Sequence, residues 1–99
     1  MSVSEEIQAR RFRLGGRVQG VGFRNFAQHA AEKLGVHGYV RNRRDGHVEV
    51  FAMGTPKQLL QLRQALAKGP LMSYVAELNV EPDVLDPRYA DDFTIEMTI

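Results

Sequence analysis

Residues 11–34 read RFRLGGRVQGVGFRNFAQHAAEKL and combine a strand pattern, a glycine-rich stretch and a helix pattern. The first part, Arg11 to Gly16, predicts a short strand in which Phe12 and Leu14 face the same side. An apolar pattern with helical spacing starts at Phe23, directly after the glycines. The stretch therefore predicts a strand, a loop and a helix that follow one another directly in the sequence.

The glycine-rich stretch, residues 16–22, predicts a loop that binds an anion. Three glycines in seven positions would destabilise the interior of a strand or helix, whereas a loop accommodates them. The unpaired N–H groups and the dipole at the start of the following helix favour negative charge. Arg24 falls in the first turn of that helix, and its planar guanidinium matches phosphate oxygens. Glycine spacing alone fits a phosphate site and a structural turn equally well, and a single helix arginine is commonly just solvated. The two features together favour phosphate.

The helix predicted from Phe23 has one apolar face and ends at Gly35, a residue suited to the left-handed conformation that stops helices. Arg24 lies off the apolar face, so its charge does not have to enter the core. The residues of the apolar face are Phe23, Phe26, Ala27, Ala30, Ala31 and Leu34.

Residues 36–53 predict a β-hairpin around Arg44-Asp45-Gly46, with two possible registers. A two-residue turn would mix apolar and charged side chains on each face. A three-residue loop with a left-handed Gly46 separates an apolar face from an amphipathic one and pairs opposite charges, so we favour it. Its apolar face pairs Asn42 with Val48, Val40 with Val50 and Gly38 with Ala52, and its other face pairs Tyr39 with Phe51, Arg41 with Glu49 and Arg43 with His47.

The second half of the chain predicts a further helix and two strands. Thr55-Pro56-Lys57-Gln58 is typical of a helix start, and Gly69-Pro70 of a helix end. Alternating residues predict strands over 74–81 and 93–99, joined by a loop over 82–92. The order β-α-β-β-α-β plus a C-terminal strand predicts a ferredoxin-like α/β sandwich, an α+β fold with two helices on one face of a mainly antiparallel sheet. Right-handed crossovers place the first and third strands side by side in its centre.

Composition and charge bound the class of protein. The 99 residues allow one domain, which we place at 10–99 after a flexible tail at 1–9. A net charge of +1 gives no indication of a nucleic-acid or membrane partner. There is no cysteine and no long apolar run, so we expect a cytoplasmic protein, and a monomer by default. The three histidines, at positions 29, 37 and 47, have no metal-binding spacing, and we expect no metal.

Asn42 is the other polar residue that stands out. The favoured register places its amide on the helix-covered face near the end of its strand, where it needs a hydrogen-bonding partner. A turn-capping role and a role in a site explain this position equally well. Glu49 is expected to pair with Arg41, and Asp45 to stabilise the turn.

Two motifs resemble the signatures of the acylphosphatase family. GRVQGVGFR at residues 16–24 resembles the first, and GVHGYVRN at 35–42, running on into DGHVE at 45–49, resembles the second. The resemblance implies hydrolysis of the carboxyl–phosphate bond of a small acyl phosphate to a carboxylate and inorganic phosphate, with no metal or cofactor. It implies catalytic roles for Arg24 and Asn42. The residues it implies for binding the substrate phosphate are Gly16, Arg17, Val18, Gln19, Gly20, Val21, Gly22 and Arg24.

Two departures from the family pattern are visible. Tyr39 stands where many members have tryptophan, and we expect it on the face of the sheet away from the site. Gly15 adds a second glycine beside Gly16 and loosens the end of the strand.

Two other functions fit the same fold. One is a non-enzymatic anion-binding module, against which the intact Arg24 and Asn42 argue. The other is RNA binding, because ferredoxin-like sheets stack bases on aromatic side chains of their open face. Tyr39 and Phe51 are the clear aromatic pair predicted on that face, and the usual RNA-recognition pattern is absent.

Overall fold

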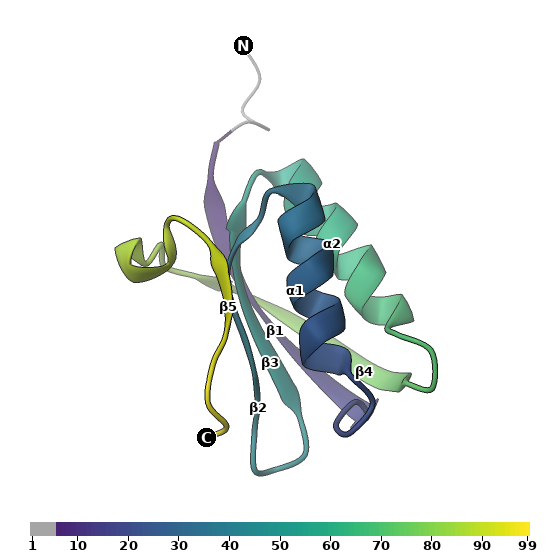
Figure 1. Cartoon of the computed structure of the whole chain (residues 1–99). Helices are drawn as coiled ribbons and strands as arrows, with labels where there is room; N and C mark the ends of the chain where they lie inside the picture. The colour runs from purple at the N-terminus through teal and green to yellow at the C-terminus, as the bar shows by residue number, and fades with distance from the viewer. Residues whose placement is uncertain (1–5) are drawn as a thin grey trace.

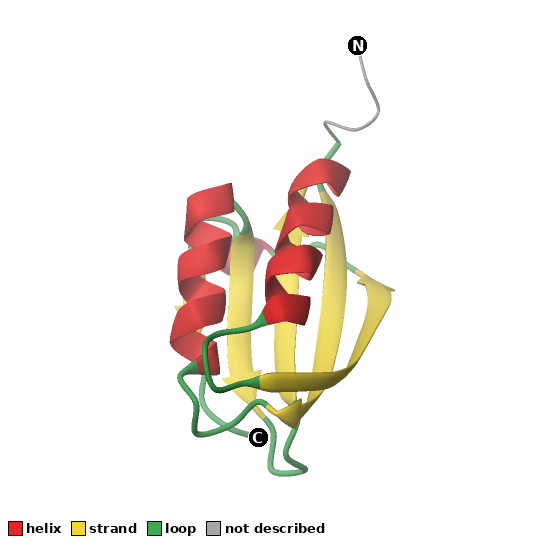
Figure 2. Ribbon diagram, turned by 90° about the vertical axis from the view of Figure 1, so that its right-hand side faces the viewer, coloured by secondary structure: helices red, strands yellow, loops and turns green. Residues whose placement is uncertain are grey.

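The computed structural model describes residues 6–99, which form a sheet with two helices packed on one face (Figures 1 and 2). The ferredoxin-like sandwich predicted from the sequence is confirmed. The elements in chain order are β1 (Gln8–Arg17), α1 (Phe23–Leu34), β2 (His37–Asn42), β3 (Val48–Gly54), α2 (Pro56–Lys68), β4 (Tyr74–Asp83), the 3-10 helix η2 (Pro87–Tyr89) and β5 (Phe93–Ile95). Neither helix of the described chain is long and apolar enough to cross a membrane.

The strand order is β4-β1-β3-β2-β5, so β1 and β3 are neighbours as predicted. All pairings are antiparallel except the one between β2 and β5. Both helices pack on the same face of this sheet (Figure 2). The loop after β1, the start of α1 and the end of β2 consequently lie at one end of the molecule (Figure 1).

The hairpin formed by β2 and β3 has the register favoured from the sequence. Asn42 pairs with Val48, and Arg41 pairs with Glu49 on the opposite face. Gly46 has a positive φ of 93°, and its N–H donates to the carbonyl of Arg43 at 3.0 Å. The three-residue loop is therefore confirmed, and Asn42 faces the helices.

The core lies between the sheet and the helices. Each helix buries the face that its apolar spacing predicts, and Gly35 ends α1 with φ 77°. At the start of α2 the Thr55 hydroxyl accepts from the Gln58 N–H at 3.2 Å, and the Gln58 side chain accepts from the Thr55 N–H at 2.8 Å. The fully buried side chains of the core include Phe12, Leu14, Val18, Phe23, Val40, Val48, Val50, Leu62 and Leu66.

The strand β4 departs from the simple alternation predicted for residues 74–81. Opposite Gly15 and Gly16 of β1, β4 carries one extra residue, Ala76, and this β-bulge shifts the register so that Leu78 and Val75 both pack against the core. Tyr74 is 68% exposed as a result, although simple alternation puts it on the same face as Leu78. A Cβ atom at Gly16 would lie 2.3 Å from the carbonyl oxygen of Tyr74, so the bulge requires glycine there.

The loop predicted over residues 82–92 is partly structured. Pro82 and Asp83 extend β4, which tolerates proline because it is an edge strand. The short helix η2 places Tyr89 against Tyr39, with ring centroids 5.0 Å apart. Tyr39 also stacks on Phe51 at 5.5 Å, and Phe51 is only 4% exposed. On the other sheet face, Phe51 is therefore covered and Tyr39 is partly buried, with Tyr89 packed against both rings.

The first and last strands differ in length from the predictions. The first strand was predicted over 11–16, but β1 begins at Gln8 and its Ala9 is buried, so the predicted tail at 1–9 overlaps it; residues 1–5 lie outside the described residues. The last strand was predicted over 93–99, but β5 ends at Ile95, because residues 96–99 lose the regular register with β2. The N–H of Glu96 donates to Val40, and the N–H of Ile99, three residues later, donates to Asn42, only two residues after Val40. This mismatch interrupts the regular ladder.

Candidate active site

The glycine loop, the first turn of α1 and the end of β2 surround a cavity of about 270 Å³. Arg24 and Asn42, the two predicted catalytic residues, both line it. Its full lining consists of Val18, Gly20, Gly22, Phe23, Arg24, Asn25, Asn42 and Ile95. The glycine loop, Arg24 and the end of β2 therefore meet at one cavity.

The backbone of the loop depends on glycine at two positions beside the cavity. Gly20 has φ 75° and Gly22 has φ 76°, and a Cβ atom at either would meet nothing within 4 Å. Left-handed backbone conformation, rather than lack of space, is thus the reason for glycine here. These two residues turn the chain from β1 into α1 and leave the cavity open beside the backbone.

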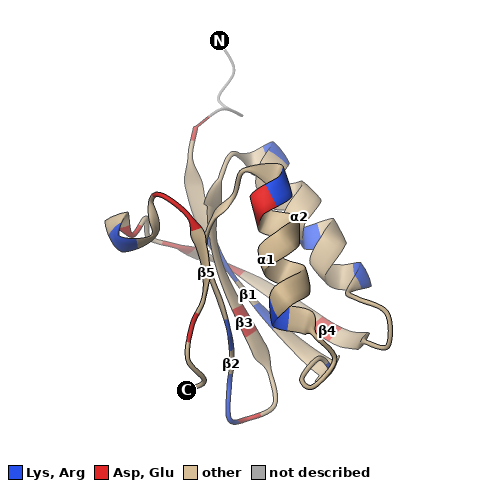
Figure 3. Cartoon of the chain, in the orientation of Figure 1, with Lys and Arg blue, Asp and Glu red and all other residues tan. Residues whose placement is uncertain are grey.

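The first turn of α1 presents its N–H groups without competition from a capping side chain. Gly22 occupies the N-cap position and has no side chain that could accept hydrogen bonds from those N–H groups. No acidic residue lies in this turn, and Arg24 supplies a positive charge (the basic segment at the start of α1 in Figure 3). None of the ion pairs within residues 6–99 involves Arg24. The turn is therefore electropositive and suited to an anion.

Asn42 is the last residue of β2 and is held through its backbone. It pairs with Val48 of β3 on one side, and its carbonyl accepts from the N–H of Ile99 at 3.2 Å on the other. Asn42 also lines the cavity, together with residues of the first turn of α1. Two neighbouring chain segments thus fix the position of the Asn42 backbone.

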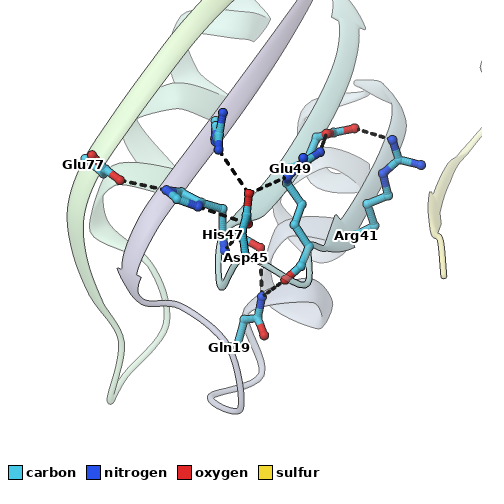
Figure 4. Close-up of polar contacts among 8 residues, drawn as sticks. Gln19, Arg41, Asp45, His47, Glu49 and Glu77 are labelled. Atoms are coloured by element: carbon cyan, nitrogen blue, oxygen red, sulfur yellow. Dashed lines mark hydrogen bonds and ion pairs between the residues drawn. The ribbon is translucent and has the colours of Figure 1, made fainter. Parts of the chain in front are cut away.

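The other predicted phosphate-binding residues have different positions. Val18 lines the cavity but its side chain belongs to the buried core and anchors the loop. Gln19 uses its side chain to reach the hairpin, where its Nε2 donates to the carbonyls of Arg43 and His47 at 2.7 and 2.9 Å (Figure 4). Gly16, Arg17 and Val21, like Gln19, are absent from the cavity lining. Of the loop, only Val18, Gly20 and Gly22 line the cavity.

Three lining residues were not singled out from the sequence. Phe23 and Asn25 belong to the same helical turn as Arg24, so the helix pattern could have indicated them. Ile95 comes from β5, whose pairing with β2 places it in register with Val40, beside the end of β2. No local sequence signal connects Ile95 with the loop.

A buried carboxylate stabilises the hairpin on the face away from the cavity. Glu49 is 4% exposed and accepts from the Tyr39 hydroxyl at 2.7 Å. It also pairs with Arg41 at 2.8 Å and with Arg43 at 2.9 Å (Figure 4). Burial acts to raise the pKa of Glu49, but the hydrogen bond from Tyr39 and the two arginines outweigh it and lower that pKa. Tyr39 lies on this face, as expected for the residue that replaces tryptophan.

The hairpin loop has its own set of polar contacts. Asp45 accepts from the backbone N–H of His47 at 3.0 Å and from Arg43 at 3.2 Å. These hydrogen bonds, the first of them above all, hold the pKa of Asp45 well below its usual range. Asp45 therefore stabilises the turn, as predicted, and Glu49 pairs with Arg43 in addition to its predicted partner Arg41.

Comparison with known proteins identifies the family. The family model described as Acylphosphatase matches residues 10–95. The chain is 47% identical over 97 residues to the acylphosphatase of Koribacter versatilis, which covers 98% of this chain and 87% of that protein. The crystal structure of acylphosphatase from Bacillus subtilis superposes with a TM-score of 0.85 at 35% identity, covering 92% of this chain and 99% of that one.

An acylphosphatase structure from Coxiella burnetii gives the same TM-score, 0.85, at 31% identity, with 91% and 93% of the two chains covered. The chain belongs to the acylphosphatase family. The resemblance noted in its two motifs is thus confirmed, together with the enzyme class that it implied, a hydrolase of acyl phosphates.

Proposed function

We propose that the cavity is the active site, in which the loop and Arg24 bind the phosphoryl group of an acyl phosphate and Asn42 orients the attacking water. The observation that carries this proposal is that Arg24, from the first turn of α1, and Asn42, from the end of β2, line one cavity. The open N–H groups at the start of α1 and the adjoining guanidinium suit the phosphoryl oxygens. The Asn42 amide lies at a strand end, where its backbone is held on both sides.

The reaction is displacement at phosphorus. The water oxygen forms a bond to phosphorus while the bond from phosphorus to the acyl oxygen breaks, and the electron pair leaves on the carboxylate. A carboxylate is a weak base, with a pKa of about 4 for ordinary carboxyl groups, so it needs no general acid to leave. A proton of the water passes to a phosphoryl oxygen of the substrate. The products are a carboxylate and inorganic phosphate.

The residues around the cavity favour the substrate as proton acceptor. Apart from Arg24, the cavity lining contains only apolar residues, glycines and two asparagines. Arginine stays protonated at any ordinary pH and cannot act as a base. Catalysis in this proposal therefore rests on positioning and on stabilising the charge that develops on the phosphoryl oxygens, which are the main contributions in phosphoryl transfer generally.

The direct test is release of inorganic phosphate from acetyl phosphate, with p-nitrophenyl phosphate as a phosphomonoester control. The proposal predicts turnover of the first substrate and negligible turnover of the second, because an alkoxide or phenolate leaves less readily than a carboxylate. Turnover should be unchanged by EDTA. Equal rates on both substrates, or loss of activity with the chelator, would contradict the proposal.

The proposed substrate is a small acyl phosphate handled by a single chain in the cytoplasm. Light scattering on the active protein at assay concentration tests the monomer directly, since a stable dimer would double the measured mass.

A further inference from the structure

The side chain of Gln19 lies between the phosphate-binding loop and the β2–β3 hairpin (Figure 4). Its Nε2 donates to the carbonyl of Arg43 at 2.7 Å and to the carbonyl of His47 at 2.9 Å. Both distances are those of good hydrogen bonds. One side-chain nitrogen thus joins two segments that are far apart in the sequence.

The two acceptors belong to the residue pair that closes the hairpin loop. The N–H of Arg43 donates to His47 across this pair at 2.8 Å. Asn42, the last residue of β2, directly precedes Arg43, so the bridge from Gln19 reaches the hairpin one residue away from the proposed water-orienting amide. A bond at this point limits movement of the strand end relative to the loop.

The Nε2 atom of Gln19 cannot also donate a hydrogen bond to the substrate. A glutamine Nε2 carries two hydrogens, and the two carbonyls use both. The remaining Oε1 atom is only an acceptor and would repel phosphoryl oxygens. Gln19 is also absent from the cavity lining. Its side chain therefore acts on the hairpin rather than on the substrate.

We propose that Gln19 is a positioning residue, which sets Asn42 at the correct distance from the phosphoryl group held by the loop and Arg24. This inference rests on the proposed function, because it needs Asn42 to orient the water. Other side chains also hold the hairpin, but on the opposite face of the sheet: Arg13 contacts Asp45 at 3.1 Å, and Glu77 contacts His47 at 2.8 Å. They link the hairpin to β1 and β4, and Gln19 links it to the loop.

The first experiment replaces Gln19 with alanine and with glutamate. Gln19→Glu keeps the shape but places a carboxylate oxygen against two carbonyl oxygens, and Gln19→Ala removes the bridge. We expect kcat on acetyl phosphate to fall about tenfold or more in both, since small displacements of a reacting group have effects of that size. The inhibition constant of inorganic phosphate should change less than about twofold, because the variants keep Arg24 and every backbone N–H of the loop.

Two control variants separate this effect from general loosening. Gln64→Ala removes the same side chain from an exposed position on α2, and Arg13→Ala breaks an exposed contact of the same hairpin. Both should keep the kcat of the original protein. If Gln19→Ala and Gln19→Glu also keep it, or if phosphate binding weakens in parallel with kcat, the positioning role is wrong.

The second experiment is a double-mutant cycle of Gln19→Ala with Asn42→Ala. If Gln19 acts through Asn42, its loss should lower kcat no further once the Asn42 amide is gone. Independent, multiplicative effects on kcat would contradict the positioning role while leaving the proposed function intact. An unchanged kcat in Asn42→Ala alone would instead contradict the role of Asn42 in the proposed function. Urea unfolding of all variants identifies any that are not folded under assay conditions, and Gln19→Asn, which shortens the bridge, then replaces an unfolded variant in the cycle.

Discussion

Arg24, in the first turn of α1, and Asn42, the last residue of β2, line the same cavity from two different layers of the fold. One belongs to the helical layer and the other to the sheet. Their relation therefore depends on how α1 packs on β2, and on the loop that connects β1 with α1. This dependence gives each residue a separate experimental signature.

Replacing Arg24 with alanine should raise the barrier of hydrolysis by at least ~3 kcal/mol, by analogy with removal of one donor that stabilises a developing oxyanion. This corresponds to a fall of about 10²-fold in kcat/KM on acetyl phosphate. Arg24→Lys should recover only part of the loss, because lysine cannot donate two parallel hydrogen bonds. The exposed Arg63 of α2 is the matched control, and Arg63→Ala should behave like the original protein.

Phosphate binding provides a readout of Arg24 that does not depend on turnover. A ligand that binds only the folded protein raises its melting temperature, so inorganic phosphate should stabilise the original chain. Arg24→Ala should show a much smaller rise at the same phosphate concentration. An equal rise in both proteins would mean that phosphate binds elsewhere, and the assignment of the cavity would fail.

Replacing Asn42 with alanine should lower kcat by about 10²-fold while changing the inhibition constant of phosphate less than about threefold. In the proposed mechanism the amide acts on the water in the transition state, whereas the loop and Arg24 bind the phosphoryl group before and after reaction. Steady-state kinetics with phosphate as inhibitor separate the two quantities. Asn79→Ala, on the exposed side of β4, is the control. A change confined to phosphate affinity would assign Asn42 to binding instead.

Ile95 should influence which acyl group the enzyme prefers. Its side chain is 37% exposed and lines the cavity beside the buried Val18 and Phe23. Loss of apolar contact in a binding pocket changes discrimination by about tenfold for one or two methylene groups. Ile95→Ala should thus lower kcat/KM for benzoyl phosphate about tenfold more than for acetyl phosphate. The control is Leu60→Ala, at an exposed position of α2, which should leave the ratio of the two kcat/KM values unchanged. If Ile95→Ala also left this ratio unchanged, the acyl group would bind away from Ile95.

The hairpin register was predictable because only one alignment separates charged from apolar side chains. Arg41 opposite Glu49 on one face and Val40 opposite Val50 on the other leave little choice. The bulge opposite Gly15 and Gly16 could not be predicted, because Ala76 suits either face of β4 and so gives no sign of an extra residue. The sequence therefore predicted the inward position of Asn42 but not the packing of Val75 against the core.

The role of the Gln19 side chain could not be predicted from the sequence for a different reason. Its acceptors are backbone carbonyls, which every residue possesses, so no residue type marks them. The same holds for Ile95, whose place in the cavity depends on a parallel pairing that ends after three residues. Local patterns locate residues within an element, whereas contacts between distant segments require the packed structure.

The buried Glu49 makes the stability of the hairpin depend on pH. Its pKa is lowered in the folded protein, so the folded state prefers the carboxylate and gains stability above the pKa of the unfolded chain, about 4.3 for glutamate. This contribution is lost as the pH falls through the lower pKa of the folded state. Glu49→Gln leaves Arg41 and Arg43 without their shared carboxylate and should cost about 2–3 kcal/mol at pH 7, the arginines being partly exposed. Urea unfolding between pH 7 and about pH 3 should show the two proteins converging as the pH falls, whereas a constant difference would mean that Glu49 stabilises the fold through its shape and not its charge.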